Sequence, residues 1–167
     1  MNQRWKPSVT VAAIASRSRA GRTEYLLVEE ETPDGRRLNN PAGHLDPGES
    51  PQQAVIRETL EETARAFVAE RLVGIYLARV AHDKNGADLT YLRLAFAGQV
   101  GEADPQRRLD AGIVRTLWMT LEELRDSRDR HRSPLVLRGI EDAAAGRAFP
   151  LDAIVTDASV YGQASAR

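Results

Sequence analysis

Three glutamates in the middle of the chain have the spacing of one helix face, and together they have the chemistry of a metal site. Glu58, Glu61 and Glu62 stand at positions i, i+3 and i+4, which places them within about 100° of one another on an α-helix. Like charges at this spacing repel each other, so a helix that carries them gains when a hard cation sits among the oxygens. Mg²⁺, or alternatively Mn²⁺, suits all-oxygen ligands and keeps waters that a phosphate can displace. The pattern predicts a divalent-metal site; the alternative is an acidic helix face exposed to solvent.

The residues around these glutamates favour the metal site. Gly43 and Gly48 belong to a segment rich in glycine, proline and asparagine, residues 39–48, which we expect to be an irregular loop whose backbone can approach a ligand closely. Arg57 directly precedes the first glutamate, and Glu49 stands at the entrance of the helix. An ion pair between Arg57 and Glu49 would hold the carboxylates in position.

The same residues reproduce a family motif. The Nudix box reads Gly-x5-Glu-x7-Arg-Glu-U-x-Glu-Glu-x-Gly-U, where U is apolar, and the chain resembles the Nudix hydrolases because it carries Gly43, Glu49, Arg57, Glu58, Glu61 and Glu62 at the matching positions.

Three positions depart from the motif. Thr59 and Arg65 stand where an apolar residue is usual, and Ala64 replaces the closing glycine. That glycine would end the helix in a left-handed conformation, so Ala64 implies either modest strain or a helix that continues toward Phe67. None of the three departures removes a metal ligand.

The resemblance implies a fold and an activity. The fold is an α/β/α sandwich with a central mixed β-sheet, and the reaction is the attack of water on one phosphorus of a diphosphate. Carried over by motif position, the metal ligands are Glu58, Glu61, Glu62 and the main-chain carbonyl of Ala42. Glu58 or Glu61 is the expected general base. Two acidic residues further along the chain are the alternatives for that role, Glu102 and Asp104.

Candidate substrate-binding residues lie outside the box. His44 follows the box glycine and is expected either to contact phosphate or to pack against the helix start. Lys6, Tyr91 and Arg93 are candidates for binding phosphate or stacking on a base. Tyr91 and Arg93 share one strand face by their spacing of two, so both face the site or neither does.

Other features outside the box have more ordinary interpretations. Tyr76 and Trp118 are expected in the core, as aromatic residues on strands usually are. The mixed-charge run 125–132 is interpreted as a solvated connector, with a basic lid over polyphosphate as the alternative.

The resemblance extends beyond the box to the bacterial NudJ-type phosphatases, in segments 6–7, 9–11, 27–30, 41–45, 132–136 and 149–151. It implies hydrolysis of hydroxymethylpyrimidine pyrophosphate and of nucleoside di- and triphosphates. The alternatives are a broad nucleoside triphosphatase, a dinucleoside polyphosphate hydrolase, and a Nudix-like module that binds a nucleotide without cleaving it.

The elements that must position these residues follow from hydrophobic patterns. Ser50 and Pro51 predict a helix start, and the helix is expected to run to Ala66, with Ile56, Leu60, Thr63 and Phe67 as its buried stripe and the glutamates opposite. Strands are expected at 9–15, 25–31, 72–81, 89–100 and 113–119, with a turn at 82–86. Further helices are expected to start at Thr120, in a capping box, and at Ser133-Pro134, the latter reaching Gly146.

Composition bounds the interpretation. The chain has 167 residues and predicts one domain, 1–160, with a frayed tail at 161–167. It has no cysteine, which excludes disulfides and thiol nucleophiles. A net charge of -1 argues against nucleic acid or membrane partners. No apolar stretch is long enough to span a bilayer or form a signal peptide. We expect a soluble, cytoplasmic enzyme, monomeric or homodimeric, acting on a small pyrophosphate or nucleotide.

Overall fold

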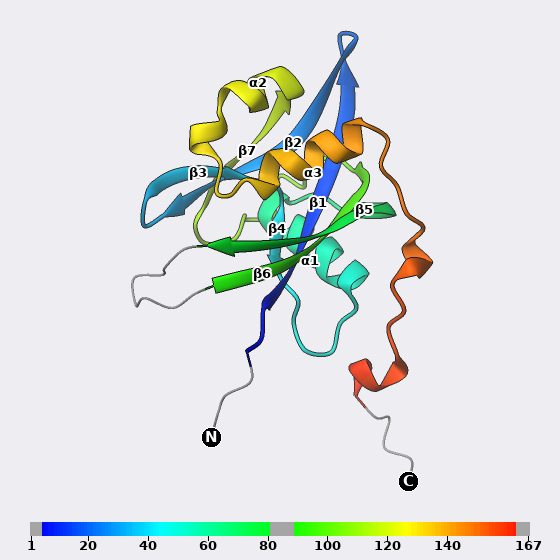
Figure 1. Cartoon of the computed structure of the whole chain (residues 1–167). Helices are drawn as coiled ribbons and strands as arrows, with labels where there is room; N and C mark the ends of the chain where they lie inside the picture. The colour runs from blue at the N-terminus through cyan, green and yellow to red at the C-terminus, as the bar shows by residue number, and fades with distance from the viewer. Residues whose placement is uncertain (1–4, 81–88, 163–167) are drawn as a thin grey trace.

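The computed structural model describes residues 5–80 and 89–162, which form a mixed sheet with helices on both faces (Figure 1). The strands are β1 (Ser8–Arg19), β2 (Arg22–Thr32), β3 (Gly35–Asn39), β4 (Ala42–His44), β5 (Phe67–Val80), β6 (Leu89–Val100) and β7 (Ile113–Thr120). The α-helices are α1 (Pro51–Thr63), α2 (Leu121–Asp126) and α3 (Leu135–Ala144), and 3₁₀ turns lie at Arg128–Arg130, Leu151–Ala153 and Ala158–Tyr161.

Strand β1 is the element to which the rest of the sheet attaches. Its first half pairs in parallel with β6 and antiparallel with β4, and its second half pairs antiparallel with β2. The main strand order is β3-β2-β1-β6-β5, with β7 on the other side of β2. Because β1 is bordered on both edges and covered on both faces, its residues 10–15 are all buried, as expected for a central strand.

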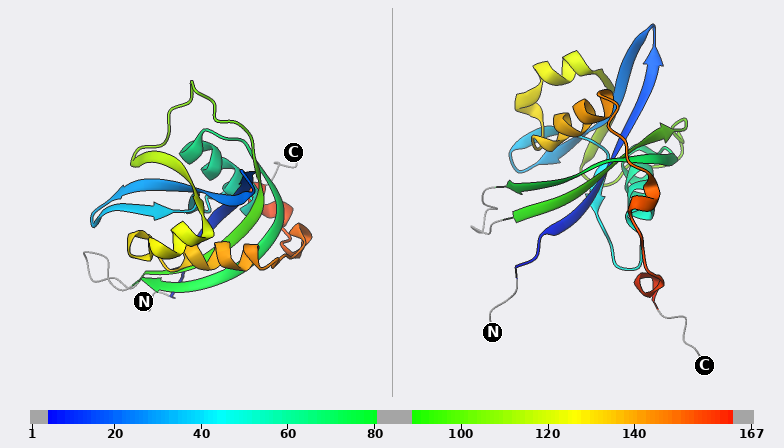
Figure 2. Two further views of the ribbon diagram at one scale, coloured as in Figure 1. Left: turned by 90° about the horizontal axis from the view of Figure 1, so that it is seen from above. Right: turned by 45° about the vertical axis from the view of Figure 1, so that its right-hand side comes forward.

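Two hydrophobic clusters lie on opposite faces of this sheet. Val11 and Ala13 of β1 pack in a cluster with Val55 of α1, whereas Ile14 packs in a second cluster with α2 and α3 residues such as Ile140. Side chains alternate between faces along a strand, so α1 covers one face and α2 with α3 covers the other (Figure 2). This arrangement confirms the predicted α/β/α sandwich with a central mixed sheet.

Helix α1 begins where the sequence predicts but ends earlier. Ser50 caps it by accepting a hydrogen bond from the Gln53 amide at 3.1 Å, while the Gln53 side chain accepts one from the Ser50 amide at 2.8 Å. The helix ends at Thr63, and Ala64 adopts the left-handed conformation at φ 54°. The predicted end at Ala66 is therefore wrong, and the chain takes the strained alternative at Ala64.

The predicted buried stripe of α1 is wrong in part. Ile56 is 40% exposed, and Phe67, although buried, belongs to β5. The residues of α1 that are buried are Ala54, Val55, Thr59, Glu62 and Thr63. The hydroxyls of Thr59 and Thr63 donate to the carbonyl four residues earlier, at 2.7 and 2.6 Å, so both threonines can be buried without an unpaired polar group.

The structure also explains how Arg65 takes the place of the apolar residue that is usual in the motif. Its guanidinium donates to the Gly101 carbonyl at 2.8 Å and lies 5.8 Å from the centre of the Trp118 ring. Trp118 packs against the first cluster and also contacts Arg17, at 4.2 Å. The apolar part of a long arginine side chain can replace an apolar residue in such a position.

Other strand boundaries differ from the predicted ones because pairing with neighbouring strands determines where a strand begins. The segment 39–48 is not wholly irregular, because Ala42–His44 pairs with β1 as strand β4. Strand β5 starts at Phe67, five residues before the predicted start, because it pairs with β6 along its whole length. Strand β6 has the predicted bounds, and Thr120 caps α2 in the predicted capping box with Glu123.

Some predicted features remain outside the described residues. The predicted turn at 82–86 and the last part of the tail, 163–167, are among them. Tyr161 and Gly162 are described, at the end of the last 3₁₀ turn. No helix in the described ranges has the length and hydrophobicity needed to cross a membrane.

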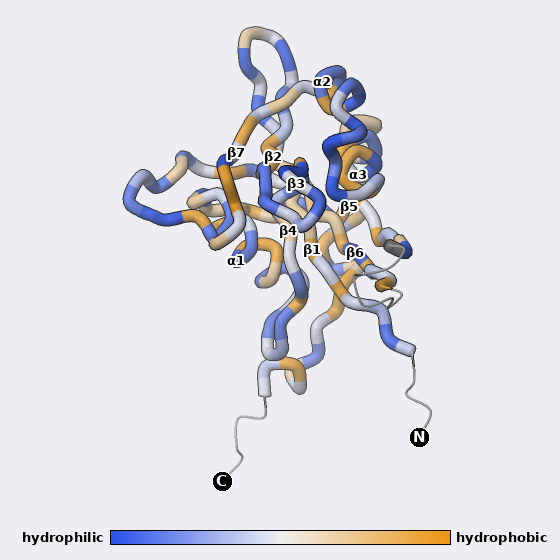
Figure 3. Tube along the Cα trace, turned by 90° about the vertical axis from the view of Figure 1, so that its left-hand side faces the viewer, coloured by the Kyte–Doolittle hydropathy of each residue, from blue (hydrophilic) through white to orange (hydrophobic). Residues whose placement is uncertain are grey.

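The hairpin between β1 and β2 extends beyond the helices and is largely hydrophilic (Figure 3). Arg19 pairs with Arg22, and the two-residue turn has positive φ at both positions, 50° at Ala20 and 74° at Gly21. These are the dihedral signs of a type I′ turn, which favours Asn-Gly because alanine is strained there.

We therefore expect Ala20→Asn to raise the free energy of unfolding by about 0.5–1 kcal/mol, since asparagine tolerates the left-handed region. Urea denaturation of the variant and the parent measures the change. Ala20→Val is the matched control, because a β-branched residue is more strained at this φ and should lower the free energy of unfolding. An unchanged or lower value for Ala20→Asn would contradict the type I′ assignment.

Candidate functional site

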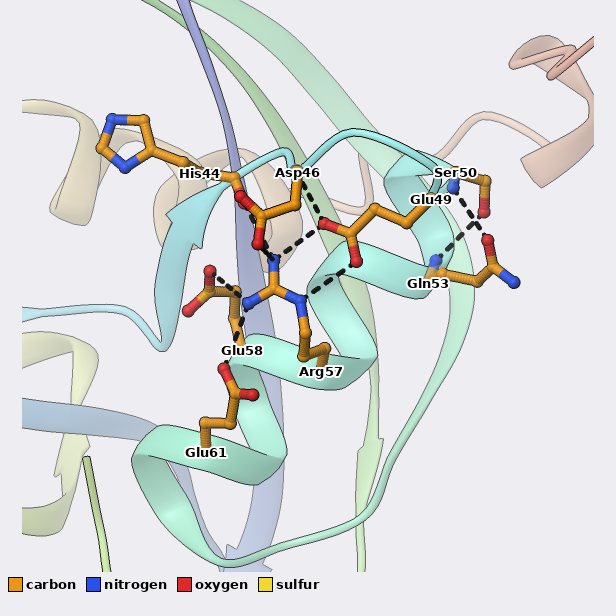
Figure 4. Close-up of polar contacts among 8 residues, drawn as sticks. All are labelled: His44, Asp46, Glu49, Ser50, Gln53, Arg57, Glu58 and Glu61. Carbon is orange, nitrogen blue, oxygen red and sulfur yellow. Dashed lines mark hydrogen bonds and ion pairs between the residues drawn. The ribbon is translucent and has the colours of Figure 1, made fainter. Parts of the chain in front are cut away.

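Arg57 of α1 joins the helix to the loop that precedes it (Figure 4). Its guanidinium donates to both oxygens of Glu49, with Nε at 3.0 Å and Nη2 at 2.7 Å. Nη2 also donates to the main-chain carbonyl of His44 at 3.0 Å. On the helix itself, Nη1 donates to Glu58 at 2.8 Å and to Glu61 at 3.1 Å. A guanidinium fork suits this paired recognition of a carboxylate.

These contacts explain the titration behaviour of the pair. Hydrogen bonding from Arg57 holds the pKa of Glu49 below its usual value, and the bond to Glu49 raises the pKa of Arg57. Both groups therefore stay charged at neutral pH. The predicted ion pair between Arg57 and Glu49 is present, and it fixes the position of the loop relative to the carboxylates.

Glu58 lies directly against the backbone of Gly43 in β4. A Cβ atom on Gly43 would overlap the Glu58 carboxylate, so no other residue fits there without moving that carboxylate. Burial raises the pKa of Glu58 above its usual value, and the neighbouring Arg57 opposes this effect. Gly43 is required here for space rather than for an unusual backbone angle, since its φ is not positive.

Glu62 is a buried carboxylate on the next turn of α1. It accepts a hydrogen bond from the Ala42 amide at 2.9 Å, which ties α1 to β4. The pKa of Glu62 is raised to about 8, mainly by burial and also by the negative charges of Glu30 and Glu58, while the hydrogen bond from the Ala42 amide opposes the rise. Glu58 and Glu62 thus both contact the short strand β4, each in an environment that disfavours its negative charge.

This donor set fits a divalent cation. Buried carboxylates near one another are destabilised as anions, and a hard cation among their oxygens would remove that penalty. In the described part of the chain no three acidic or histidine side chains already stand close enough together to bind one ion. Arg57 engages the oxygens of Glu58 and Glu61 instead. Ala42 lies beside the carboxylates, as the motif implies for a residue that supplies a carbonyl.

Of the two further carboxylates suggested by the sequence, Glu102 is fully exposed, 3.9 Å from Arg65. Asp104 lies at the end of α1, where its amide donates to the Ala64 carbonyl at 2.8 Å, and its side chain accepts from the Gln106 amide at 2.9 Å. A third acidic residue, Asp110, lies at the same end of the helix. Its amide donates to the Glu61 carbonyl at 3.1 Å.

The charge of Asp110 contributes to the raised pKa of both Glu58 and Glu62. Sequence reasoning missed this residue because nothing in its local pattern distinguishes it from other acidic loop residues.

A pocket of about 410 Å³ adjoins β4 on the side where α3 begins. Its wall includes Gly43 and His44 of β4 together with Tyr91 and Arg93 of β6. The rings of His44 and Tyr91 are 6.2 Å apart, and the His44 ring points away from the Arg57 guanidinium (Figure 4). The structure therefore brings three of the four predicted substrate-binding residues together. Lys6 is exposed and is not part of this wall.

The mixed-charge connector is mostly exposed, as predicted, and two of its arginines form ion pairs with β2. Arg130 pairs with Glu29 at 2.6 Å, and Arg132 pairs with Glu30 at 3.2 Å and lines the pocket. Tyr76 packs against the second cluster, and its hydroxyl donates to Asp142 at 2.9 Å, away from the carboxylates of α1.

Comparisons with known proteins show the family of the chain. The family model described as "NUDIX domain" matches residues 6–138. Phosphatase NudJ of Escherichia coli strain K12 is 33% identical over 151 residues, which cover 90% of this chain and 92% of that protein. Among solved structures, a NUDIX hydrolase from Nitrosomonas europaea is 48% identical with a TM-score of 0.82, covering 91% of this chain and 98% of that one. A C. elegans Ap4A hydrolase is 25% identical with a TM-score of 0.53, covering 83% and 98%. The chain is therefore an enzyme of the Nudix hydrolase family, similar over most of its length to the NudJ phosphatases.

Proposed function

We propose that this Nudix hydrolase uses a divalent cation and water to cleave a phosphoanhydride bond in small organic pyrophosphates. Hydroxymethylpyrimidine pyrophosphate and nucleoside di- and triphosphates are the substrates we infer from the similarity to phosphatase NudJ. The observation that carries the proposal is that the Glu58 and Glu62 carboxylates of α1 both contact β4, which also forms part of the wall of a pocket. All the carboxylates of the box are retained, which favours catalysis over binding alone.

The residues have distinct roles in this proposal. Glu58, Glu61, Glu62 and the Ala42 carbonyl would hold Mg²⁺, or Mn²⁺ in its place. When bound, such an ion neutralises phosphate oxygens and acidifies a coordinated water. Glu62 is held by the Ala42 amide, and only 13% of the Glu58 side chain is exposed.

Glu61 is the carboxylate of the three best placed to take a proton from water. Its side chain is 31% exposed, and it has no main-chain partner comparable to that of Glu62. Asp110 is the alternative, because it lies against the same end of α1. Arg57 and Glu49 act through the carboxylates, by positioning them.

We also propose that the catalytic domain extends over residues 1–160. The family model ends at residue 138, but the chain beyond it is still attached to the sheet. Phe149 forms a bridge with Leu72 of β5, and Leu151 and Ile154 pack against the first hydrophobic cluster.

The first prediction about the activity is a metal-dependent release of phosphate. The panel contains hydroxymethylpyrimidine pyrophosphate, nucleoside di- and triphosphates, ADP-ribose and diadenosine polyphosphates, each assayed with Mg²⁺ and with EDTA. We expect EDTA to abolish turnover and activity to be highest on the first two classes. If diadenosine polyphosphate is the best substrate and is split into two nucleotides, the proposed substrates are wrong. No turnover of any compound would favour a module that binds a nucleotide without cleaving it.

The second prediction concerns the general base. Glu61→Gln should lower kcat by about 10²- to 10⁴-fold, the usual contribution of a positioned base, while circular dichroism and thermal unfolding stay close to the parent. Glu122→Gln is the matched control, since that side chain is exposed on α2, which covers the opposite face of the sheet, and its kcat should not change. A parent-like Glu61→Gln combined with a collapse of kcat in Asp110→Asn would transfer the role to Asp110.

The third prediction tests the contact between Gly43 and Glu58. Gly43→Ala should lower kcat/KM by about 100-fold, because the new methyl group displaces the carboxylate and displacements of this size have such effects. Gly101→Ala is the control, since it has ordinary backbone angles and no atom within 4 Å of the added Cβ. Equal kinetics for the two variants would show that the position of Glu58 does not matter.

A further inference from the structure

The pocket beside β4 contains polar atoms that are buried but lack partners. Buried polar groups are nearly always hydrogen-bonded, so a cluster of exceptions in one cavity calls for a ligand. In the described ranges, the atoms of this kind that line the pocket are Thr10 Oγ1, Glu30 Oε1, Asn39 Oδ1, Arg93 Nε, Arg93 Nη1 and Ser133 Oγ. They come from β1, β2, β3, β6 and the segment before α3.

The acceptors lie together on one side of the pocket. Glu30 pairs with Arg37 across the β2–β3 ladder, and Asn39 pairs with Val28, so Glu30 and Asn39 are diagonal neighbours on the same face. Arg132 binds Glu30 Oε2. Burial raises the pKa of Glu30, and the neighbouring Arg132 and Asn39 side chains oppose this effect. Two acceptors therefore remain free and adjacent, Glu30 Oε1 and Asn39 Oδ1.

The donors lie on a different strand. Arg93 stands opposite Thr10 in the parallel β1–β6 ladder, and Thr10 in turn stands opposite His44. Nε and Nη1 of Arg93 can only donate, so they require acceptors from a ligand. Glu30 and Glu62 both place negative charge near Arg93. The proposed function places the pyrophosphate at the carboxylates of α1, where a cation can neutralise it, so the acceptors at Arg93 belong to the organic group of the substrate.

We propose that this pocket selects substrates whose organic group is a heterocycle with an exocyclic amino group. The two N–H bonds of such a group match Glu30 Oε1 and Asn39 Oδ1, and Arg93 donates to an acceptor on the ring. An oxo group in the same place would face two acceptors, which is unfavourable because neither side can donate. The proposal rests on the proposed function in placing the pyrophosphate at α1, and it adds which organic group is preferred.

Calorimetric binding of matched nucleoside monophosphates tests the proposal without requiring turnover. CMP and UMP differ by an amino and an oxo group at one ring position, as do AMP and IMP. We expect the amino member of each pair to bind at least about tenfold more tightly, in the range known for paired hydrogen bonds to bases. Equal affinities within a pair, or no binding of any of the four up to about 10 mM, would overturn the proposal.

Glu30→Gln supplies the matched variant. Its amide can donate to an oxo group, so the preference for CMP over UMP should fall to within about threefold. Glu31→Gln is the control, because Glu31 is exposed and pairs with Arg36 outside the pocket, and the preference should persist in it. The comparison in the parent protein does not depend on whether Glu30→Gln folds. A preference in binding without hydrolysis would leave this inference standing and reject the proposed function, whereas hydrolysis without preference would do the reverse.

Discussion

The ion pair between Arg57 and Glu49 is the interaction on which the site depends. Arg57 is one guanidinium with partners on the helix, on the loop before it and on the backbone of β4. Because its side chain is only partly buried, the pair adds little net stability. Its effect is positional. It holds the end of β4 against α1, and β4 in turn is paired with the central strand, so the carboxylates are set relative to the whole sheet.

Around this pair the fold accumulates negative charge that its arginines neutralise only in part. Glu62 is buried and Glu58 is partly buried, and Glu30 and Asp110 add charge from β2 and from the loop before β7. Like charges in a partly desolvated region raise one another's pKa, so the arrangement is less stable than an apolar one would be. Such local instability is expected where function requires it. A divalent cation is the group that would convert the repulsion into binding energy.

Strand β4 also divides the site into two regions of different chemistry. On one side are the carboxylates of α1, and on the other is the pocket with Arg93, Glu30 and Asn39. The reacting end of a substrate and its organic group would therefore contact different elements. Residues of the first region come from one short motif, whereas those of the second come from several strands. This separation accounts for how one fold can serve relatives as different as a phosphatase and an Ap4A hydrolase.

The sequence alone determined the features that depend on residues close together in the chain. The start of α1 at Ser50 and the capping box at Thr120 could be predicted because each depends on groups three positions apart, and the ion pair of Arg57 with Glu49 because these residues are only eight positions apart. Tertiary structure decided the rest. Pairing with β1 made part of an expected loop into strand β4. Packing against the sheet buried Glu62 rather than Ile56. The loop before β7 folds back so that Asp110 contacts the end of α1. Contacts between segments far apart in sequence leave no spacing pattern, so only the folded chain shows them.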